Sequence, residues 1–536
     1  MATGTAASRL LGATRVVLAG YLLGTTTRQA DILSLAGEIP SSAYMLLAGG
    51  VLNAILVPQL IRAMRKDKDG GQAFSDRIVT LFLLLLLGLT VLLVLGTQWV
   101  TQLVTHPVWR TPELASQYQS LLTLAALCMP QVFFFGAFFL GGQLLNARDS
   151  FGPLMWAPTL NNIIQILMLG TYAVVWGFHT DTAQPFSHDQ ILLLGIGSVL
   201  GVFCQAIVLL PFLKKVGFRY RPRFDFLHTG LGSTAHMAKW ALALVAIDQA
   251  NFLIITKVAS VATAEGHGAG LTVFNSAMLV SLVPHALLTV SLATALMPSL
   301  ARLSDARLWL KFTEQLTISL KVVFSAIIPV ALLFAAMGIS VATLVWSTAK
   351  GGEYIGWTLV ILGLGLIPFS LRFLVNKAFN SMGNTRTPFF TEIIFVGVTC
   401  IVSVVLVFLV KVPTVWVAPS IAAGYTLGYL ASNWLSWRML RMGVPGMATT
   451  RIFGYTAGII ALALPGSLVA AAICWLQARY LPYFPVHLLS VIIAAVLAVV
   501  IYWGLARLAR VPEILHLETM IRARLGRTAD APRRAL

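Results

Sequence analysis

Long apolar stretches alternate with short polar ones along almost the whole chain. Most of these stretches reach or exceed the roughly 20 residues that a helix needs to cross the hydrocarbon layer of a membrane. The pattern therefore predicts an all-α polytopic membrane protein with about fourteen transmembrane helices. The predicted spans lie near residues 6–24, 32–62, 77–105, 115–146, 152–178, 189–213, 234–263, 269–300, 312–339, 353–382, 388–410, 414–437, 452–477 and 484–508.

The basic residues of the polar connections follow an alternating pattern. Every second connection is rich in Lys and Arg, and cytoplasmic loops of membrane proteins hold an excess of these residues. The basic connections and both termini are therefore predicted to be cytoplasmic, which agrees with an even number of spans. The basic set is Arg62, Arg65, Lys66, Lys68, Arg77, Arg148, Lys214, Lys215, Arg219, Arg221, Arg223, Arg302, Arg307, Arg386, Arg438, Arg441, Arg451 and the tail arginines; the opposite set is Arg28, Arg110, Lys350, Lys411 and Arg479.

A weak internal repeat relates two parts of the chain at a spacing of roughly 235–240 residues. Ala54–Arg62 reads AILVPQLIR and Thr294–Arg302 reads TALMPSLAR, while LLNARDSFGP (144–153) is echoed by AFNSMGNTRTP (378–388). Two repeats around a central cavity are a common plan of transporters. The predicted parts are a six-helix lobe over 1–226, a second six-helix lobe over 227–447, two additional helices over 448–509 and a basic cytoplasmic tail over 510–536.

Composition supports this assignment and removes several classes of protein. Hydrophobic residues make up 58% of the chain and charged residues 10%, with a mean hydropathy of +0.85, whereas soluble domains carry roughly 25% charged residues. The net charge of +18 could suggest a nucleic-acid partner, but none is expected. The basic residues lie in short loops beside spans, where they meet membrane lipids. An enzyme is not expected, since the connections are shorter than about 20 residues and a compact domain needs about 50.

The second predicted span carries a polar stripe. Asp31, Ser34, Glu38 and Ser41 are spaced so that they share one helical face. A charged side chain inside a span costs at least roughly 2.5–3.5 kcal/mol on insertion scales, so it implies a cavity, a partner or a function. The stripe faces either a substrate cavity or a hydrogen-bonded seam between helices, and the cavity is the favoured interpretation.

The first span contains two arginines and a serine. Arg15 lies deep in the span, with Ser8 seven residues earlier on the same face, whereas Arg9 lies near the predicted cytoplasmic end. A guanidinium presents a planar fork that matches phosphate oxygens. Arg15 is therefore the first candidate for an anion contact, and Arg9 either joins it or reaches the lipid headgroups.

Two later spans also carry polar residues. Arg372, Asn376 and Asn380 form an i, i+4, i+8 stripe in the tenth span, and Asp248 lies in the seventh. An acidic group with amide oxygens suits a cation or proton site. The alternative is that Asp248 pairs with a basic residue for purely structural reasons.

Five segments resemble the MurJ/MviN family in order along the chain. They are SRLLGATRVVLAGYLLGTTTRQADILSLAGEIPSSAYMLLAGGVLNAILVPQL (8–60), WAPTLNNIIQ (156–165), LPFLKKVGFRYRPRFDF (210–226), VPHALLTVSLATALMPSLARL (283–303) and NSMGNTRTP (380–388). The resemblance covers essentially the whole chain. It implies the fold of the MOP superfamily, to which the MATE exporters also belong.

The resemblance also implies a function. Members of this family are flippases that move lipid II, the undecaprenyl-pyrophosphate-linked peptidoglycan precursor, across the bacterial cytoplasmic membrane by alternating access. Cell-wall synthesis proteins would be partners, and no cofactor is expected beyond sodium. By this resemblance the headgroup cavity includes Ser8, Arg9, Arg15 and Asp31, the tail groove involves the two C-terminal spans, and a sodium site involves Asp248, Asn376 and Asn380.

Some positions depart from the family pattern. Tyr44 stands where many members have a cavity arginine, and Leu279 and Leu282 stand where they have a further arginine and an acidic residue. Arg372 is then the predicted substitute as a headgroup contact. The open alternatives are a flippase for another polyprenyl-linked glycan, a MATE-like exporter and a degenerate flippase kept as a membrane scaffold; the two additional spans argue against a plain twelve-helix exporter.

Overall fold

The computed structural model describes residues 2–47, 63, 69, 71–178, 184–226, 231–266, 268–346, 351–446, 449–481, 484–515 and 518–519. Most of these residues are helical and none lies in a strand, which confirms the predicted all-α class. Several predicted features lie outside the described residues: 48–62 of the second span, the repeat copy at 54–62, the tail from 520, and Arg62, Arg65, Lys66, Lys68 and Lys350.

Twelve helical runs in the described part of the chain are long and apolar enough to cross a membrane. Two further predicted spans are also helical but more polar: α2 (Arg28–Leu47) includes three charged residues, and α17 (Val417–Gly443) includes two. Polar side chains at these positions are expected where helices face one another rather than lipid. The count of about fourteen spans stays a prediction.

The described chain forms two compact units. The first unit holds residues 1–276, 346–355 and 396–424. Its helices are α1 (Ala2–Leu23), α2, α4 (Gln72–Leu95), α5 (Thr97–Val104), α6 (Ala115–Cys128), α7 (Gln131–Asn146), α8 (Gly152–Trp176), α9 (His188–Ile207), α10 (Leu210–Lys215) and α11 (Leu231–Ala264), with the short 3₁₀ turns η2 (Pro107–Arg110), η3 (Pro112–Leu114) and η7 (Thr414–Trp416).

Helix boundaries in the first unit follow from local chemistry. Ser187 begins α9 with a capping box, because its hydroxyl accepts from the Gln190 amide while the Gln190 side chain accepts from the Ser187 amide. Gly217 follows α10 at a φ of 83°, a left-handed conformation that ends a helix at little cost in glycine. Helices α1 and α9 pack on α8, and α2 packs on α6, α7 and α11.

The second unit holds residues 277–345, 356–395 and 425–536. Helices α12 (Leu271–Pro284), α16 (Arg386–Val404) and α17 divide between the two units, α15 (Gly352–Ser381) lies mostly in the second, and a π-helical turn, η6 (Val405–Leu409), follows α16. The other helices of the second unit are the π-helical turn η5 (His285–Val290), α13 (Ser291–Asp305), α14 (Trp309–Val345), α18 (Thr449–Tyr480) and α19 (Phe484–Leu508).

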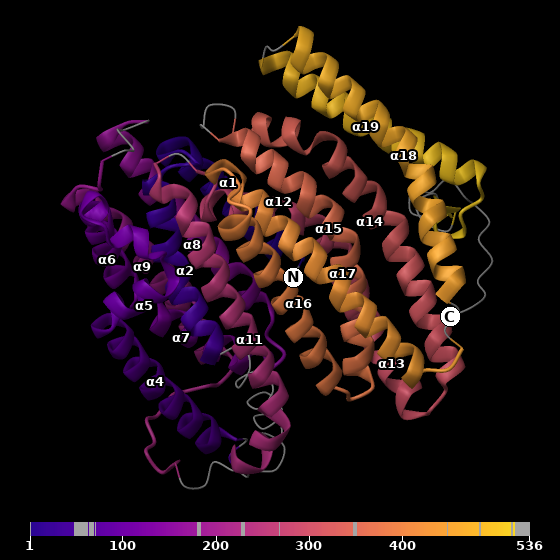
Figure 1. The fold of residues 1–536 in the computed structure, drawn as a ribbon. Helices are drawn as coiled ribbons and strands as arrows, with labels where there is room; N and C mark the ends of the chain where they lie inside the picture. The colour runs from indigo at the N-terminus through magenta and orange to yellow at the C-terminus, as the bar shows by residue number, and fades with distance from the viewer. Residues whose placement is uncertain are drawn as a thin grey trace. The chain divides into compact units, whose positions relative to one another are not determined.

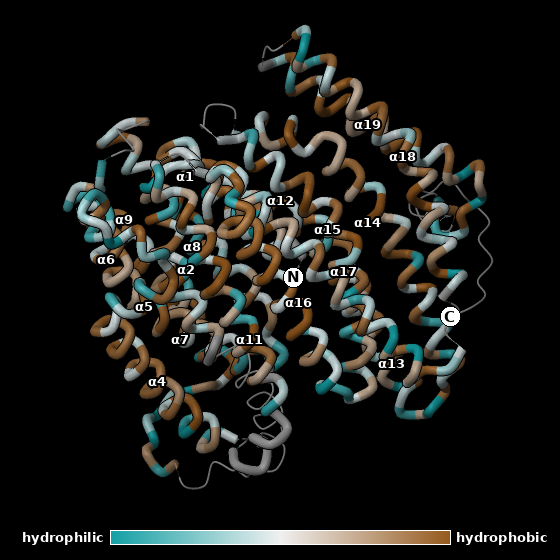
Figure 2. The backbone as a smooth tube through the Cα atoms, viewed as in Figure 1, coloured by the Kyte–Doolittle hydropathy of each residue, from teal (hydrophilic) through white to brown (hydrophobic). Residues whose placement is uncertain are grey.

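The last two helices, α18 and α19, form a pair that packs on α14 (Figure 1). Two tyrosines fix this pair: Tyr502 donates to the Ser325 carbonyl at 2.6 Å, and Tyr455 donates to Glu513 at 2.8 Å. The outer surface of α19 is apolar, with Val500 and Leu489 each about 60% exposed, and Figure 2 shows hydrophobic stretches along the long helices. Apolar exposure of this kind is expected where the surrounding solvent is lipid.

Candidate functional site

Asp31 of α2 is fully buried and binds the first residues of α12. Its carboxylate accepts from the backbone amides of Leu271 at 3.3 Å and Thr272 at 2.9 Å, and from the hydroxyls of Thr272 at 2.6 Å and Thr263 at 2.8 Å. A carboxylate is stabilised at a helix N-terminus by the unpaired amides and the helix dipole. Asp31 therefore fixes α2 to the start of α12.

Arg28 lies one turn earlier on α2 and binds the other side of the same connection. Its guanidinium donates to the carbonyl of Ala264 at 2.9 Å and to that of Thr263 at 3.3 Å, both in the last turn of α11. A cation is favoured at a helix C-terminus. The first turn of α2 thus caps the end of α11 with a positive group and the start of α12 with a negative one. We call this set of residues the α2 clamp; its members are Arg28, Asp31, Thr263, Ala264, Leu271 and Thr272.

The polar stripe of α2 continues along this seam. The hydroxyls of Ser34 and Thr272 are 2.9 Å apart, and the Asn275 side-chain amide donates to the Glu38 carboxylate. These pairs are separated by 238 and 237 residues in sequence, which is the spacing of the predicted repeat. For the described residues the stripe is therefore a hydrogen-bonded seam between α2 and α12, and a substrate role for Asp31 and Glu38 stays a prediction.

Arg15 and Ser8 form a second polar group, on the contact of α1 with α8. Arg15 is partly buried and donates to the Gln165 side-chain carbonyl at 2.7 Å, and Asn162 donates to the Ser8 backbone carbonyl at 2.9 Å. A guanidinium has five N–H donors, and the Gln165 contact uses one of them. The structure therefore brings Ser8 and Arg15 together along α8, while Arg9 is exposed.

Arg372 has very different surroundings in the second unit. It is 7% exposed, forms an ion pair with Glu392 of α16 and donates to the Ser432 hydroxyl of α17 at 3.1 Å. Its guanidinium also lies over the rings of Phe395 at 4.4 Å and Tyr429 at 5.9 Å. These contacts favour a structural role, because a substrate phosphate would have to compete with a buried carboxylate.

A buried histidine, which no sequence pattern marked as a site residue, lies on the π-helical turn η5. His285 is within 3.1 Å of the Ser370 hydroxyl, and its ring centroid lies 4.2 Å from that of Phe369 and 5.0 Å from that of Phe373. The only sequence signal was the preceding Pro284, which lacks an amide donor and so shifts the helical ladder.

The three residues of the predicted sodium site belong to different units. Asp248 lies on α11 in the first unit, whereas Asn376 and Asn380 lie on α15 in the second, where Asn380 is exposed. The side-chain oxygen of Asn376 is buried and has no hydrogen-bond partner. Within the described residues, no cluster of three or more His, Cys, Asp or Glu is arranged to hold a metal. A shared sodium site stays a prediction.

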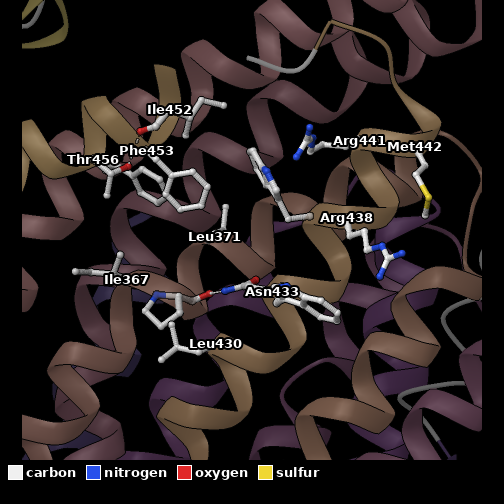
Figure 3. Close-up of a pocket in the computed structure, with 14 residues that line it drawn as sticks. Ile367, Leu371, Leu430, Asn433, Arg438, Arg441, Met442, Ile452, Phe453 and Thr456 are labelled. Atoms are coloured by element: carbon white, nitrogen blue, oxygen red, sulfur yellow. Dashed lines mark hydrogen bonds between the residues drawn. The ribbon is translucent and has the colours of Figure 1, made fainter. Parts of the chain in front are cut away.

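A deep apolar groove lies in the second unit between α14, α15, α17 and α18. Its volume is about 890 Å³. Figure 3 shows Arg438 and Arg441 of α17 on one side and Ile452, Phe453 and Thr456 of α18 on the other. The remaining lining residues are Phe324, Ile367, Pro368, Leu371, Leu430, Asn433, Trp434, Trp437 and Met442. The groove therefore suits a long apolar chain.

Comparison with known proteins decides the family. Residues 19–506 match the family model described as lipid II flippase MurJ. The chain belongs to the lipid II flippase MurJ family. A probable lipid II flippase MurJ of Haemophilus influenzae is 24% identical over 440 residues, which cover 78% of this chain and 81% of that protein. One from Vibrio cholerae is 24% identical over 486 residues, covering 88% of this chain and 87% of that protein.

Solved structures support the same fold. The structure titled lipid II flippase MurJ, inward closed conformation, has a TM-score of 0.72 at 17% identity and covers 94% of this chain and 98% of its own. An inward-facing MATE family transporter of the MOP superfamily has a TM-score of 0.61 at 14% identity, covering 84% of this chain and 96% of its own. The chain thus has the fold of the MurJ family, which MATE transporters share.

Tyr44, which departs from the family pattern, is part of an aromatic cluster. Its ring stacks on Phe135 at a centroid distance of 5.6 Å and meets the edge of Phe139 at 6.3 Å. The position is therefore filled by packing against α7.

Proposed function

We propose that this chain is a flippase for lipid II, the polyprenyl-pyrophosphate-linked peptidoglycan precursor. The observation that carries the proposal is the family match over residues 19–506. The geometry adds two parts that such a substrate needs. One is a cation inside a span, Arg15, which uses one donor on Gln165 among the described residues, and the other is a groove of about 890 Å³ with apolar walls. Transport of an intact lipid breaks no covalent bond, so the proposal includes no catalytic residue.

In the proposed mechanism the pyrophosphate meets Arg15 from the cytoplasmic side. Phosphate oxygens accept from a guanidinium in charge-assisted hydrogen bonds, which are roughly twice as strong as neutral ones. The polyprenyl tail stays in the apolar groove between α17 and α18, so that only the polar headgroup has to cross the interior. Both termini are cytoplasmic in this proposal, as the loop charges predict.

The α2 clamp serves as the closure of the opposite, outer side. Opening between α2 and α12 would have to break three hydrogen bonds of Asp31, to Leu271 and Thr272, and the seam contacts of Ser34 and Glu38. These hydrogen bonds stabilise the conformation that is closed on the outer side until substrate binding favours the conformation that is open there. Cell-wall synthesis proteins would then receive the headgroup outside.

We further propose sodium as the coupling ion, with oxygen ligands from Asp248, Asn376 and Asn380. Carboxylate and amide oxygens are the ligands that hard cations prefer. Replacing external and internal Na⁺ by K⁺ is expected to slow transport, and an unchanged rate would remove sodium from the mechanism.

A second candidate is a flippase for another polyprenyl-linked glycan. The observation in its favour is the aromatic cluster of Tyr44, Phe135 and Phe139, at a position where the family resemblance leads us to expect a cation. This change makes the site less cationic and would suit a less anionic headgroup.

The decisive experiment measures lipid II in the outer leaflet of cells that are depleted of their own flippase and supplied with this chain. Restored surface lipid II supports the proposed function. If the chain inserts normally and restores no lipid II, but restores export of another polyprenyl-linked glycan, the second candidate replaces it.

A further inference from the structure

The segment that follows α10 forms a strap along the N-terminal half of α4. We define the strap as Phe218–Phe226; its residues up to Asp225 are non-helical. The Arg219 carbonyl accepts from the Gln72 side chain at 2.9 Å, and the backbone amides of Arg221 and Arg223 donate to Asp76 at 3.2 Å and to the Thr80 hydroxyl at 3.1 Å. Backbone groups of every second residue therefore bind α4, which is the repeat of an extended chain.

This pinning places three arginine side chains on one face of the strap. Side chains of residues i, i+2 and i+4 of an extended chain point the same way and are roughly 6–7 Å apart along it. Arg219, Arg221 and Arg223 are all exposed, as are Lys214 and Lys215 just before the strap. Five basic groups thus lie within ten residues, three of them in a row with a fixed backbone.

Further contacts hold the strap ends. Phe218 is buried beneath the guanidinium of Arg148, which lies 5.2 Å from its ring centroid. At the other end, Arg77 donates to the Asp225 carboxylate at 2.7 Å, and this hydrogen bond holds the pKa of Asp225 below its ordinary value. The Arg77–Asp225 pair therefore fixes this end of the strap to α4.

The acidic side chains around the strap are already engaged. Asp69 accepts from the backbone amides of Ala73 at 2.7 Å and Gly71 at 3.0 Å, while Asp76 accepts from Gln72 at 3.0 Å and from the strap backbone. These contacts order the start of α4 and the strap. The surplus charge of the outward face is therefore positive.

The strap also carries exposed rings beside its arginines. Phe224 is 67% exposed and Tyr220 is 41% exposed, and the strap follows directly on the apolar run His188–Lys215, one of the membrane-spanning candidates. Aromatic rings and basic groups together at the end of a span are typical of the headgroup layer of a membrane. Lipid therefore fits this surface better than an acidic protein does.

We propose that the strap is a binding site for anionic phospholipids, whose phosphates bind the row Arg219, Arg221 and Arg223. The fixed backbone favours this contact, since a preorganised site loses less conformational freedom on binding. The site is separate from Arg15 and from the groove, so it stands independently of the transported substrate.

The test measures binding of fluorescent phosphatidylglycerol to the purified full-length chain in neutral detergent, with phosphatidylcholine as the reference lipid. The variant R219Q/R221Q/R223Q is compared with R302Q/R307Q/K311Q, which removes the same charge from exposed positions at the end of α13, the start of α14 and the turn between them. One basic group near an anionic surface is worth about fivefold in binding. We expect the strap variant to weaken phosphatidylglycerol binding more than tenfold and the control variant less than twofold.

A third variant keeps every charge. Thr80→Val removes the hydroxyl that binds Tyr220 and the Arg223 amide, and a severalfold loss is expected because the row is no longer held. Equal losses in both triple variants, or no loss in the strap variant at an unchanged melting temperature, would overturn the proposal. Two further results would also overturn it. One is that inorganic phosphate displaces the fluorescent lipid as strongly as unlabelled phosphatidylglycerol does, and the other is that the strap binds polyglutamate and does not bind phosphatidylglycerol.

Discussion

Two arginines inside membrane-spanning helices, Arg15 and Arg372, show how the surroundings of a charge separate a structural role from a binding role. Arg372 is 7% exposed and has a carboxylate, a hydroxyl and two aromatic rings around it. Arg15 is partly buried, and its hydrogen-bond partner within the described part of the chain is the side-chain oxygen of Gln165. The chain itself neutralises the first charge, whereas the second retains donors for an anionic ligand.

The largest expected effect comes from removing Glu392. Glu392→Ala leaves the Arg372 charge buried without its carboxylate, which typically costs roughly 3–5 kcal/mol in stability. Thermal unfolding of the purified protein measures this loss. The double variant R372M/E392M removes both charges and is expected to recover most of the stability; a Glu392→Ala protein that melts like the wild type would contradict the structural role of the pair.

Arg15 is expected to show the opposite behaviour. Arg15→Gln removes charge-assisted hydrogen bonds to phosphate that are worth roughly 1.5–3 kcal/mol, so transport of lipid II should fall at least tenfold. The melting temperature should change little, because the only partner in the described structure is Gln165. Arg9→Gln, at an exposed position of the same helix, is the control and should retain most of the transport.

A substitution of Asp31 in the α2 clamp is expected to have a smaller effect on stability and transport, and it tests the same distinction for a buried carboxylate. The Asp31 carboxylate accepts four hydrogen bonds, and Asp31→Asn replaces one of its oxygens by an NH₂ group that faces these donors. A buried polar group left without a partner lowers the stability of the fold by about 1–3 kcal/mol. We expect lower stability together with a moderate loss of transport, measured on the same samples. A variant with full stability but no transport would instead place Asp31 among the substrate contacts.

The smallest effect is expected in the groove. Leu430→Trp adds a bulky ring to the groove wall, and a severalfold decrease in transport should follow because less room is left for the tail. Leu489→Trp, on the exposed surface of α19 outside the groove lining, serves as the control. Equal transport in the two variants would argue against the groove as the tail site.

The fold followed from the sequence further than the site did. Apolar stretches predicted the helical class and most spans, because span length depends on local composition. The partners of the polar residues could not be predicted, since Arg15 and Gln165 are 150 residues apart and Arg372 and Glu392 lie on different helices. The stripe from Asp31 to Glu38 was predicted as one face, but spacing cannot distinguish a facing helix from a water-filled cavity.

The most direct test of the account is the affinity of the purified full-length chain for undecaprenyl pyrophosphate, compared among the wild type, Arg15→Gln and R372M/E392M. The account predicts that Arg15→Gln binds at least tenfold more weakly, while the double variant binds within about twofold of the wild type. Normal binding by Arg15→Gln together with a large loss in the double variant would reverse the assigned roles and contradict the account.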